Sequence, residues 1–243
     1  MENLIEIFSS VQGEGKYIGC RQIFVRFSDC NLRCAYCDTN FGRTDFCNVE
    51  NFSGAMKFSQ IKNPVSAEKT ADIIKKFHAE VPAHSVSFTG GEPLLHGNFI
   101  SKIAELLKNT GLKIFLETNG TLFEEFEKIF DSVDIVSMDI KLPSITGKNF
   151  FPQHEKFLEL ARKKDFYSKI VVSDETTLEE FNTAVDLIFS VAPKSLLILQ
   201  PVTPVGKIKS ASAEKILFLQ SIALKKLSDV RIIPQTHKFI NLL

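Results

Sequence analysis

A regular alternation of two sequence patterns constrains the fold more than any other feature of the chain. Short runs of β-branched and aromatic residues alternate with longer stretches of helical periodicity. This is typical of parallel strands joined by right-handed crossovers, and predicts an α/β fold of six β-then-α units with closing strands. The strands are expected at Leu4–Phe8, Gln22–Phe27, Ser85–Phe88, Lys113–Glu117, Ile135–Met138, Tyr167–Val172, Leu196–Gln200 and Val230–Ile233. The helices are expected at Ala67–His78, Asn98–Asn109, from Thr121, His154–Lys164, after Thr177 and at Ala213–Leu227.

Local signals mark three of the helix starts. Ser66 is expected to cap the helix that begins at Ala67, because its hydroxyl can accept from a free backbone N–H of the first turn. The pairs Thr121–Glu124 and Thr177–Glu180 both match the capping box, in which the two side chains each bind the other residue's backbone.

The length suits one large domain. The chain has 243 residues, and α/β barrels often have about 250. We therefore expect a single domain over residues 1–243, without repeats or linkers. The segment near 41–64 is rich in Gly, Asn and Ser and has weak periodicity, so it is expected to be an irregular insertion beside the cysteines.

Charge and hydropathy exclude several classes of function. Lys plus Arg and Asp plus Glu each number 29, which gives no electrostatic basis for direct nucleic-acid binding. No stretch approaches about 18 apolar residues, so no membrane span is expected. Glu2 and Glu6 stand where a signal peptide would have basic residues, so no signal peptide is expected. The five cysteines are an odd number, and with nothing that points to secretion they favour a metal site in a reducing cytoplasm.

Three cysteines, Cys30, Cys34 and Cys37, are spaced C-x3-C-x2-C after an expected strand. Thiolates this close can bind an iron–sulfur cluster or zinc. Structural zinc usually has four protein ligands, whereas three would leave one coordination position open for an exogenous group. By spacing alone, a zinc site completed by Cys20 or Cys47 stays an alternative.

Polar and glycine-containing segments follow four of the expected strands. They are Thr89–Glu92, Glu117–Gly120, Asp139–Lys141 and Gln200–Pro201. In barrels and in doubly wound sheets, the carboxyl ends of the strands line the ligand site, although periodicity alone does not choose between these folds. The adjacent glycines Gly90 and Gly91 allow the backbone to approach a ligand closely. The carboxylate of Glu92 offers an acceptor for an ammonium group.

The cysteine loop CNLRCAYCDT resembles the cluster loop of radical S-adenosylmethionine (SAM) enzymes, and GGEP at 90–93 resembles the family's SAM-binding turn. The resemblance implies a partial (β/α)6 TIM-like barrel. It also implies a 4Fe-4S cluster on the three cysteines, with an open iron that chelates SAM. Reductive cleavage of SAM would then give a 5′-deoxyadenosyl radical.

A narrower resemblance, to the 7-carboxy-7-deazaguanine synthase family, extends over nearly the whole chain. It rests on the motifs QGEG at 12–15, CDT at 37–39, ETNG at 117–120, DIK at 139–141 and QTHK at 235–238. The family converts 6-carboxy-5,6,7,8-tetrahydropterin into 7-carboxy-7-deazaguanine with loss of ammonia, on the queuosine route of tRNA modification. The resemblance also implies Mg²⁺, a flavodoxin or ferredoxin as electron donor, and a homodimer.

Site residues are carried over by motif position. Thr39 is the expected magnesium ligand, since Mg²⁺ prefers oxygen donors. The expected substrate contacts are Val11, Gln12, Gly13, Glu14, Arg26, Thr89, His237 and the terminal Leu243. The expected SAM contacts are Tyr36, Cys37, Asp38, Gly90, Gly91, Glu92, Ser137, Lys141, Gln200, Pro201, Val202 and Thr203. His237 has two possible interpretations: its imidazole lies in the site, or it is a surface residue at the end of a strand. The other four histidines are expected to be structural.

Two departures from the family pattern stand out: Asp29 where many relatives have Gly, and the insertion with Cys47.

Two other functions stay open at this point. One is a radical SAM activase of a glycyl-radical protein, although the QGEG and QTHK motifs do not favour it. The other is a non-enzymatic zinc or iron–sulfur protein.

Overall fold

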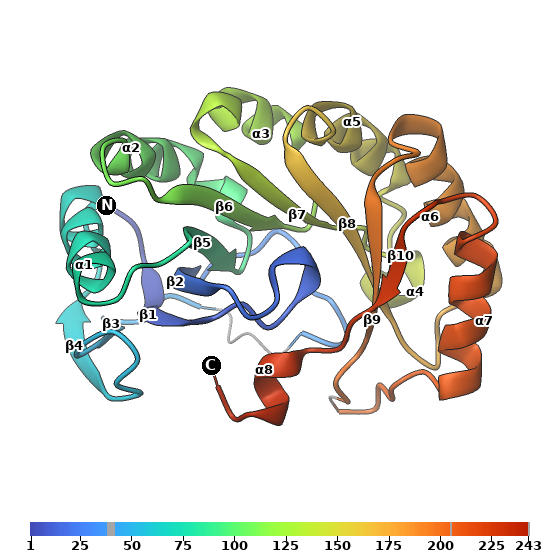
Figure 1. The fold of residues 1–243 in the computed structure, drawn as a ribbon, viewed down its shortest axis with the longest axis horizontal. Helices are drawn as coiled ribbons and strands as arrows, with labels where there is room; N and C mark the ends of the chain where they lie inside the picture. The colour runs from blue at the N-terminus through green and yellow to red at the C-terminus, as the bar shows by residue number, and fades with distance from the viewer. Residues whose placement is uncertain (38–41, 205, 243) are drawn as a thin grey trace.

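A curved sheet, open at both edges, organises the molecule. The computed structural model describes residues 1–37, 42–204 and 206–242. In these residues ten strands form one sheet in the order β10-β9-β8-β7-β6-β5-β2-β1-β3-β4, which Figure 1 shows as an arc. The strands are β1 Leu4–Val11, β2 Arg21–Phe27, β3 Phe46–Glu50, β4 Phe58–Lys62, β5 Ser85–Gly90, β6 Lys113–Thr118, β7 Ile135–Asp139, β8 Asp165–Val172, β9 Leu196–Pro201 and β10 Val230–Ile232.

The inner strands are parallel, and helices cover their outer face. Each neighbouring pair from β2 through β5 to β10 is parallel, whereas β1 runs antiparallel to β2. Figure 1 shows the helices along the outside of the arc. They are α1 Ala67–Glu80, α2 Gly97–Leu107, α3 Phe123–Ile129, α5 Phe151–Ala161, α6 Leu178–Val191 and α7 Ala213–Ala223, with short α4 Pro143–Thr146 and α8 Thr236–Phe239 elsewhere. This confirms the predicted α/β fold with a partial TIM-like barrel.

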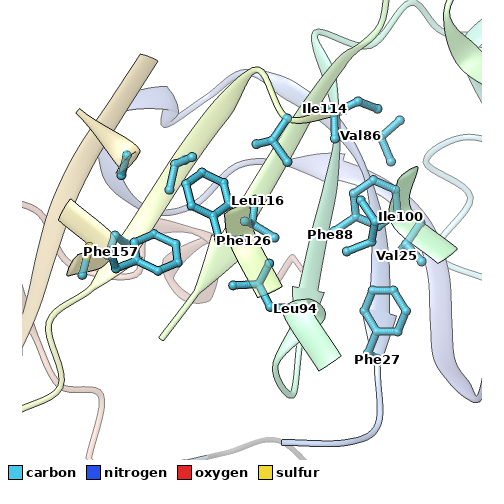
Figure 2. Close-up of a cluster of buried hydrophobic side chains, with 14 of the residues drawn as sticks. Val25, Phe27, Val86, Phe88, Leu94, Ile100, Ile114, Leu116, Phe126 and Phe157 are labelled. Atoms are coloured by element: carbon cyan, nitrogen blue, oxygen red, sulfur yellow. The ribbon is translucent and has the colours of Figure 1, made fainter. Parts of the chain in front are cut away.

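The main core lies between the sheet and these helices. Figure 2 shows Leu116 of β6 beside Phe126 of α3, with Phe157 of α5 close by. Phe126 and Phe157 are fully buried and their rings stack at 4.7 Å between centroids. Burying a side chain of this size contributes roughly 2–3 kcal/mol. The outward faces of the strands thus carry the main core. The inward face carries a smaller buried cluster of Phe115, Ile135, Tyr167, Leu196 and Ile198, and the rest of that face is left for a ligand site.

The segment near 41–64 is not irregular throughout: the prediction was wrong for Phe46–Glu50 and Phe58–Lys62, which form strands. β3 pairs in parallel with β1, and β4 pairs antiparallel with β3, so a hairpin extends one edge of the sheet. Glu50 is buried and holds the hairpin by accepting from the backbone N–H groups of Ser9, Gly54 and Met56 at 2.9, 3.1 and 2.8 Å. The edge strand β4 buries little, so its sequence lacks the alternation that marks a strand.

Two of the three predicted helix caps are confirmed. Ser66 accepts from the N–H of Lys69, and Thr177 forms a complete capping box with Glu180. The prediction at Thr121 was wrong: α3 begins two residues later, without a side-chain cap. Thr121 instead donates its hydroxyl to Asn119 Oδ1 at 2.6 Å, so the threonine belongs to the strand-end loop. In the part of the chain that the structure describes, no helix has the length and apolar character needed to cross a membrane.

Candidate active site at the carboxyl ends of the strands

A cavity of about 260 Å³ opens on the inner side of the sheet, where the parallel strands end. Every strand from β5 to β9 contributes a lining residue near its carboxyl end, for example Thr89, Thr118, Asp139, Val171 and Gln200. The predicted site residues that line it are Val11, Gln12, Gly13, Glu14, Arg26, Cys30, Cys34, Tyr36, Cys37, Thr89, Gly90, Gly91, Ser137, Lys141, Gln200, Val202, Thr203 and His237.

The remaining predicted residues fall into two groups. Asp38, Thr39 and Leu243 lie outside the described residues. Glu92 and Pro201 are described, but neither is part of the cavity lining. Pro201 ends β9, and the next residue, Val202, lines the cavity instead.

The three motif cysteines lie on one wall of the cavity, in the loop that follows β2. All are partly exposed free thiols, and the N–H of Cys37 donates to the carbonyl of Cys34 at 3.1 Å. Burial raises the pKa of Cys34, and the ammonium group of Lys141 opposes that rise. A thiolate formed here thus has a nearby cation, which favours the form of the cysteine that binds metals.

The donor set fits an iron–sulfur cluster better than a single zinc ion. Among the described residues, no three His, Cys, Asp or Glu side chains converge closely enough to hold one metal ion. In a cluster each thiolate binds a different iron, so the three sulfur atoms can stay apart. Cys47 is fully buried in the hydrophobic core, and burial raises its pKa to about 12, so the zinc site completed by Cys47 gains no support.

The glycine pair brings β5 against the cysteine loop. Gly90 has a φ of 105°, which favours glycine. A Cβ on Gly91 would lie 1.8 Å from the carbonyl oxygen of Asp29, and that same oxygen accepts from the N–H of Glu92 at 2.7 Å. Asp29 itself does not have a positive φ, so its backbone conformation does not require glycine.

Glu92 joins loops and is not part of the cavity lining, so its expected contact with an ammonium group stays a prediction. Its carboxylate is fully buried and accepts from Thr118 Oγ1 and from the N–H of Asn119, both at 2.8 Å, and from the N–H of Leu94 at 3.1 Å. Burial raises the pKa of Glu92 to about 7, although these hydrogen bonds and Lys141 oppose the rise.

Gln12 and Glu14 meet the cavity with their polar groups already oriented. Gln12 donates to Gln22 Oε1 at 3.0 Å and to Glu117 Oε1 at 2.8 Å. Glu14 forms a short ion pair with Lys169 and accepts from Gln235 Nε2 at 2.7 Å. Burial alone would raise the pKa of Glu14, but the charge of Lys169 and these hydrogen bonds outweigh it and lower the pKa to about 2. Glu14 is therefore an ionised acceptor at neutral pH.

Arg26 and Thr89 lie on neighbouring strands at the cavity. Arg26 Nε donates to Glu6 Oε1 at 2.7 Å, which orients the guanidinium group. Thr89 Oγ1 donates to Glu117 Oε2 at 2.7 Å. Glu117 thus organises two expected substrate contacts, Gln12 and Thr89, and is a lining residue to which sequence reasoning gave no individual role.

The C-terminal segment closes one side of the cavity. The backbone N–H and the hydroxyl of Thr236 both donate to the carbonyl of Gly13, at 2.9 and 3.0 Å. His237 packs directly on Gly13, where a Cβ would lie 2.1 Å from its Nδ1 atom. The structure thus decides between the two interpretations of His237: it lines the cavity from a short helix and is not a strand-end surface residue.

Other lining residues were given no individual role from the sequence, although Glu117, Thr118, Asn119 and Asp139 belong to strand-end segments that were expected at the ligand site. They are Phe8, Phe24, Leu32, Glu117, Thr118, Asn119, Asp139, Lys169, Val171, Gln235 and Lys238. A signal did exist for Lys169, because a charged residue at the centre of the apolar run Tyr167–Val172 needs a buried partner. No local pattern marks Leu32 or Phe24, whose positions depend on how the loop and sheet pack.

Comparison with known proteins agrees with this architecture. The family model described as the Radical SAM superfamily matches residues 24–188, from β2 through α6. The fold and the cysteine-lined cavity are thus those of a radical SAM protein, a class that uses a 4Fe-4S cluster and SAM.

Similarity to individual proteins is closer still. A 7-carboxy-7-deazaguanine synthase of Geobacter sulfurreducens is 42% identical over 241 residues, which cover 98% of this chain and 96% of the relative. One of Methanocaldococcus jannaschii is 38% identical over 256 residues, with 98% and 99% coverage. The crystal structure of QueE from Escherichia coli has a TM-score of 0.63 at 21% identity, with 98% and 95% coverage, and shows the shared fold. Within the radical SAM superfamily, the chain belongs to the 7-carboxy-7-deazaguanine synthase family.

Proposed function

We propose that the chain converts 6-carboxy-5,6,7,8-tetrahydropterin into 7-carboxy-7-deazaguanine and ammonia. The observation that carries this proposal is 42% identity to a synthase of that name over nearly the whole of both chains. The reaction is redox-neutral overall, because substrate and products contain the same atoms and SAM is regenerated. A bound cluster and SAM would supply the radical that removes and returns a substrate hydrogen, while the chain binds and orients the reactants.

Cys30, Cys34 and Cys37 are proposed to hold the cluster and to leave one iron for SAM. The proposal is supported by their free thiols on one cavity wall. The remaining SAM contacts are proposed among lining residues close to this wall or at the ends of β5, β7 and β9. They are Tyr36, Gly90, Gly91, Ser137, Lys141, Gln200, Val202 and Thr203.

The pterin is proposed to bind at the other end of the cavity. A pterin edge presents N–H donors and a carbonyl in one plane, and the Gln12 amide and Glu14 carboxylate offer the complementary groups. Arg26 would bind the substrate carboxylate by a charge-assisted hydrogen bond, with Thr89 and His237 beside it. These residues also surround the reacting ring and reduce its contact with water.

Further proposals concern the surroundings of the reaction. Thr39 would supply a hydroxyl ligand to Mg²⁺, together with substrate oxygens and water. A flavodoxin or ferredoxin would supply the electron, and the chain would work as a homodimer on the queuosine route. The five free cysteines support a reducing compartment such as the cytoplasm.

The test is anaerobic reconstitution with iron and sulfide, followed by addition of reductant, SAM, Mg²⁺ and the tetrahydropterin. Formation of 7-carboxy-7-deazaguanine, identified by mass, supports the proposal. SAM cleavage without product would overturn the substrate assignment and leave radical chemistry intact, as for an activase. One zinc per chain, in place of about four irons with sulfide, would overturn both.

The magnesium proposal needs its own variants. Thr39→Ser keeps the hydroxyl, whereas Thr39→Val keeps the shape and removes it. Only Thr39→Val should raise the Mg²⁺ concentration needed for half-maximal product formation. An unchanged Mg²⁺ dependence in Thr39→Val would reject Thr39 as a ligand.

A further inference from the structure

Four charged side chains form an alternating line through the cavity: Glu14, Lys169, Asp139 and Lys141. Glu14 is ion-paired with Lys169, whose Nζ lies 3.3 Å from Asp139 Oδ1. Asp139 Oδ2 accepts from Lys141 Nζ at 2.7 Å. Each of the four side chains is at most 20% exposed, so the interactions are little screened by water. Within the line two carboxylates and two ammonium groups balance, and Glu117 is a further cavity carboxylate whose charge acts on Lys169.

One contact in this line, between Lys169 and Asp139, lacks a hydrogen bond. Lys169 directs its hydrogen bond to Glu14, whereas Asp139 Oδ1 is buried without a hydrogen-bond partner although Lys169 is within ion-pair distance. A small rotation of the Lys169 ammonium group would complete a hydrogen bond to Asp139. The Asp139 carboxylate would then be hydrogen-bonded to both ammonium groups, those of Lys169 and Lys141.

The two ends of the line lie at different parts of the cavity. Glu14 contacts Gln235 at one end, near Gln12 and His237. At the other end, Lys141 Nζ lies 3.3 Å from the hydroxyl of Tyr36, which is the residue before Cys37. The line thus extends from the proposed pterin-binding end to the cysteine loop.

We propose that Lys169 and Asp139 are positioning residues that make pterin binding at Glu14 strengthen SAM binding at Lys141. This inference rests on the proposed function. N–H donors of the pterin compete with Lys169 for the Glu14 carboxylate, and the displaced ammonium group moves its hydrogen bond to Asp139 Oδ1. Asp139 then holds Lys141 less tightly, and the Lys141 ammonium group becomes a better donor to an acceptor on SAM.

The coupling is measured on the cluster-loaded enzyme without reductant, so that both ligands bind and no chemistry follows. The Kd of radiolabelled SAM is determined by equilibrium dialysis with and without saturating 6-carboxytetrahydropterin. We expect the pterin to lower the Kd about fivefold or more in the unaltered enzyme. In Asp139→Asn and Lys169→Met the factor should fall below about twofold, because the line is broken, while Lys169→Arg should keep much of it.

Asp229→Asn is the matched control. Asp229 precedes β10 and pairs with Arg231 at the surface, outside the cavity lining. Its loss should leave the coupling factor unchanged. Thermal unfolding of each variant checks folding, and if one cavity variant does not fold, the other tests the proposal.

The outcomes separate this inference from the proposed function. An unaltered enzyme that forms product but shows equal SAM affinity with and without pterin would overturn the inference alone. So would Asp139→Asn or Lys169→Met with full coupling. An enzyme that binds no pterin and forms no product would overturn the proposed function, and the inference with it.

Discussion

The side-chain amide of Asn119 donates to Asn31 Oδ1 at 2.8 Å, which joins the end of β6 to the cysteine loop. Asn31 in turn donates to Thr121 Oγ1 at 2.9 Å, and the backbone N–H of Asn119 donates to Glu92 at 2.8 Å. The loops after β2, β5 and β6 are therefore held by one hydrogen-bond network. Asn31 follows Cys30 directly, so this network restrains the position of the first cluster cysteine.

Asn119→Ala should weaken cluster retention without abolishing it. The substitution removes the hydrogen bond to the exposed Asn31 and the acceptor for the buried Thr121, at a cost of about 1–3 kcal/mol for the buried Thr121 groups. Iron per chain after anaerobic gel filtration should fall below that of the unaltered protein. Asn109→Ala, at an exposed position after α2, is the control and should retain its iron.

Cys34→Ala and Cys47→Ala should separate a cluster ligand from a core cysteine. Cys34 lines the cavity, whereas Cys47 is buried among hydrophobic side chains in β3. Loss of Cys34 should abolish the cluster absorbance, SAM cleavage and product formation together. Cys47→Ala should keep all three with a somewhat lower unfolding temperature, and loss of the cluster in this variant would contradict the assignment.

The sequence predicted most of the fold because helical and strand periodicities reflect burial, which is a local property. Where a segment buries little, as in Phe58–Lys62, the pattern disappears although the strand forms. Thr121 illustrates a second limit: its capping motif is genuine locally, but a hydrogen bond with Asn119 competes successfully. Most cavity-lining residues were predicted by motif, whereas the inward position of Glu117 and Asp139 follows only from strand register.

Gly91→Ala should disturb the cysteine loop by direct collision. The added Cβ would lie 1.8 Å from the carbonyl oxygen of Asp29, and the N–H of Gly91 is fixed to the carbonyl of Phe27 at 3.0 Å. We expect a loss of about 1–3 kcal/mol or more in unfolding free energy, together with lower iron content. Gly19→Ala is the control: it has a positive φ but open space around it, so it should cost about 1–2 kcal/mol and retain iron.

The stability of the protein in acid should depend on Glu14. The pKa of this carboxyl is lowered to about 2 from 4.5, so its contribution is fully present above pH 4.5 and is lost as the pH falls toward 2. The shift corresponds to about 3 kcal/mol of unfolding free energy. Glu14→Gln cannot titrate, so its unfolding free energy should fall less steeply between pH 4.5 and 2 than that of the unaltered protein.

Urea denaturation at a series of pH values measures both slopes. Glu175→Gln, at an exposed position, is the control and should follow the unaltered protein. Equal slopes for Glu14→Gln and the unaltered protein would show that Lys169 and Gln235 do not hold this carboxylate in its ionised form.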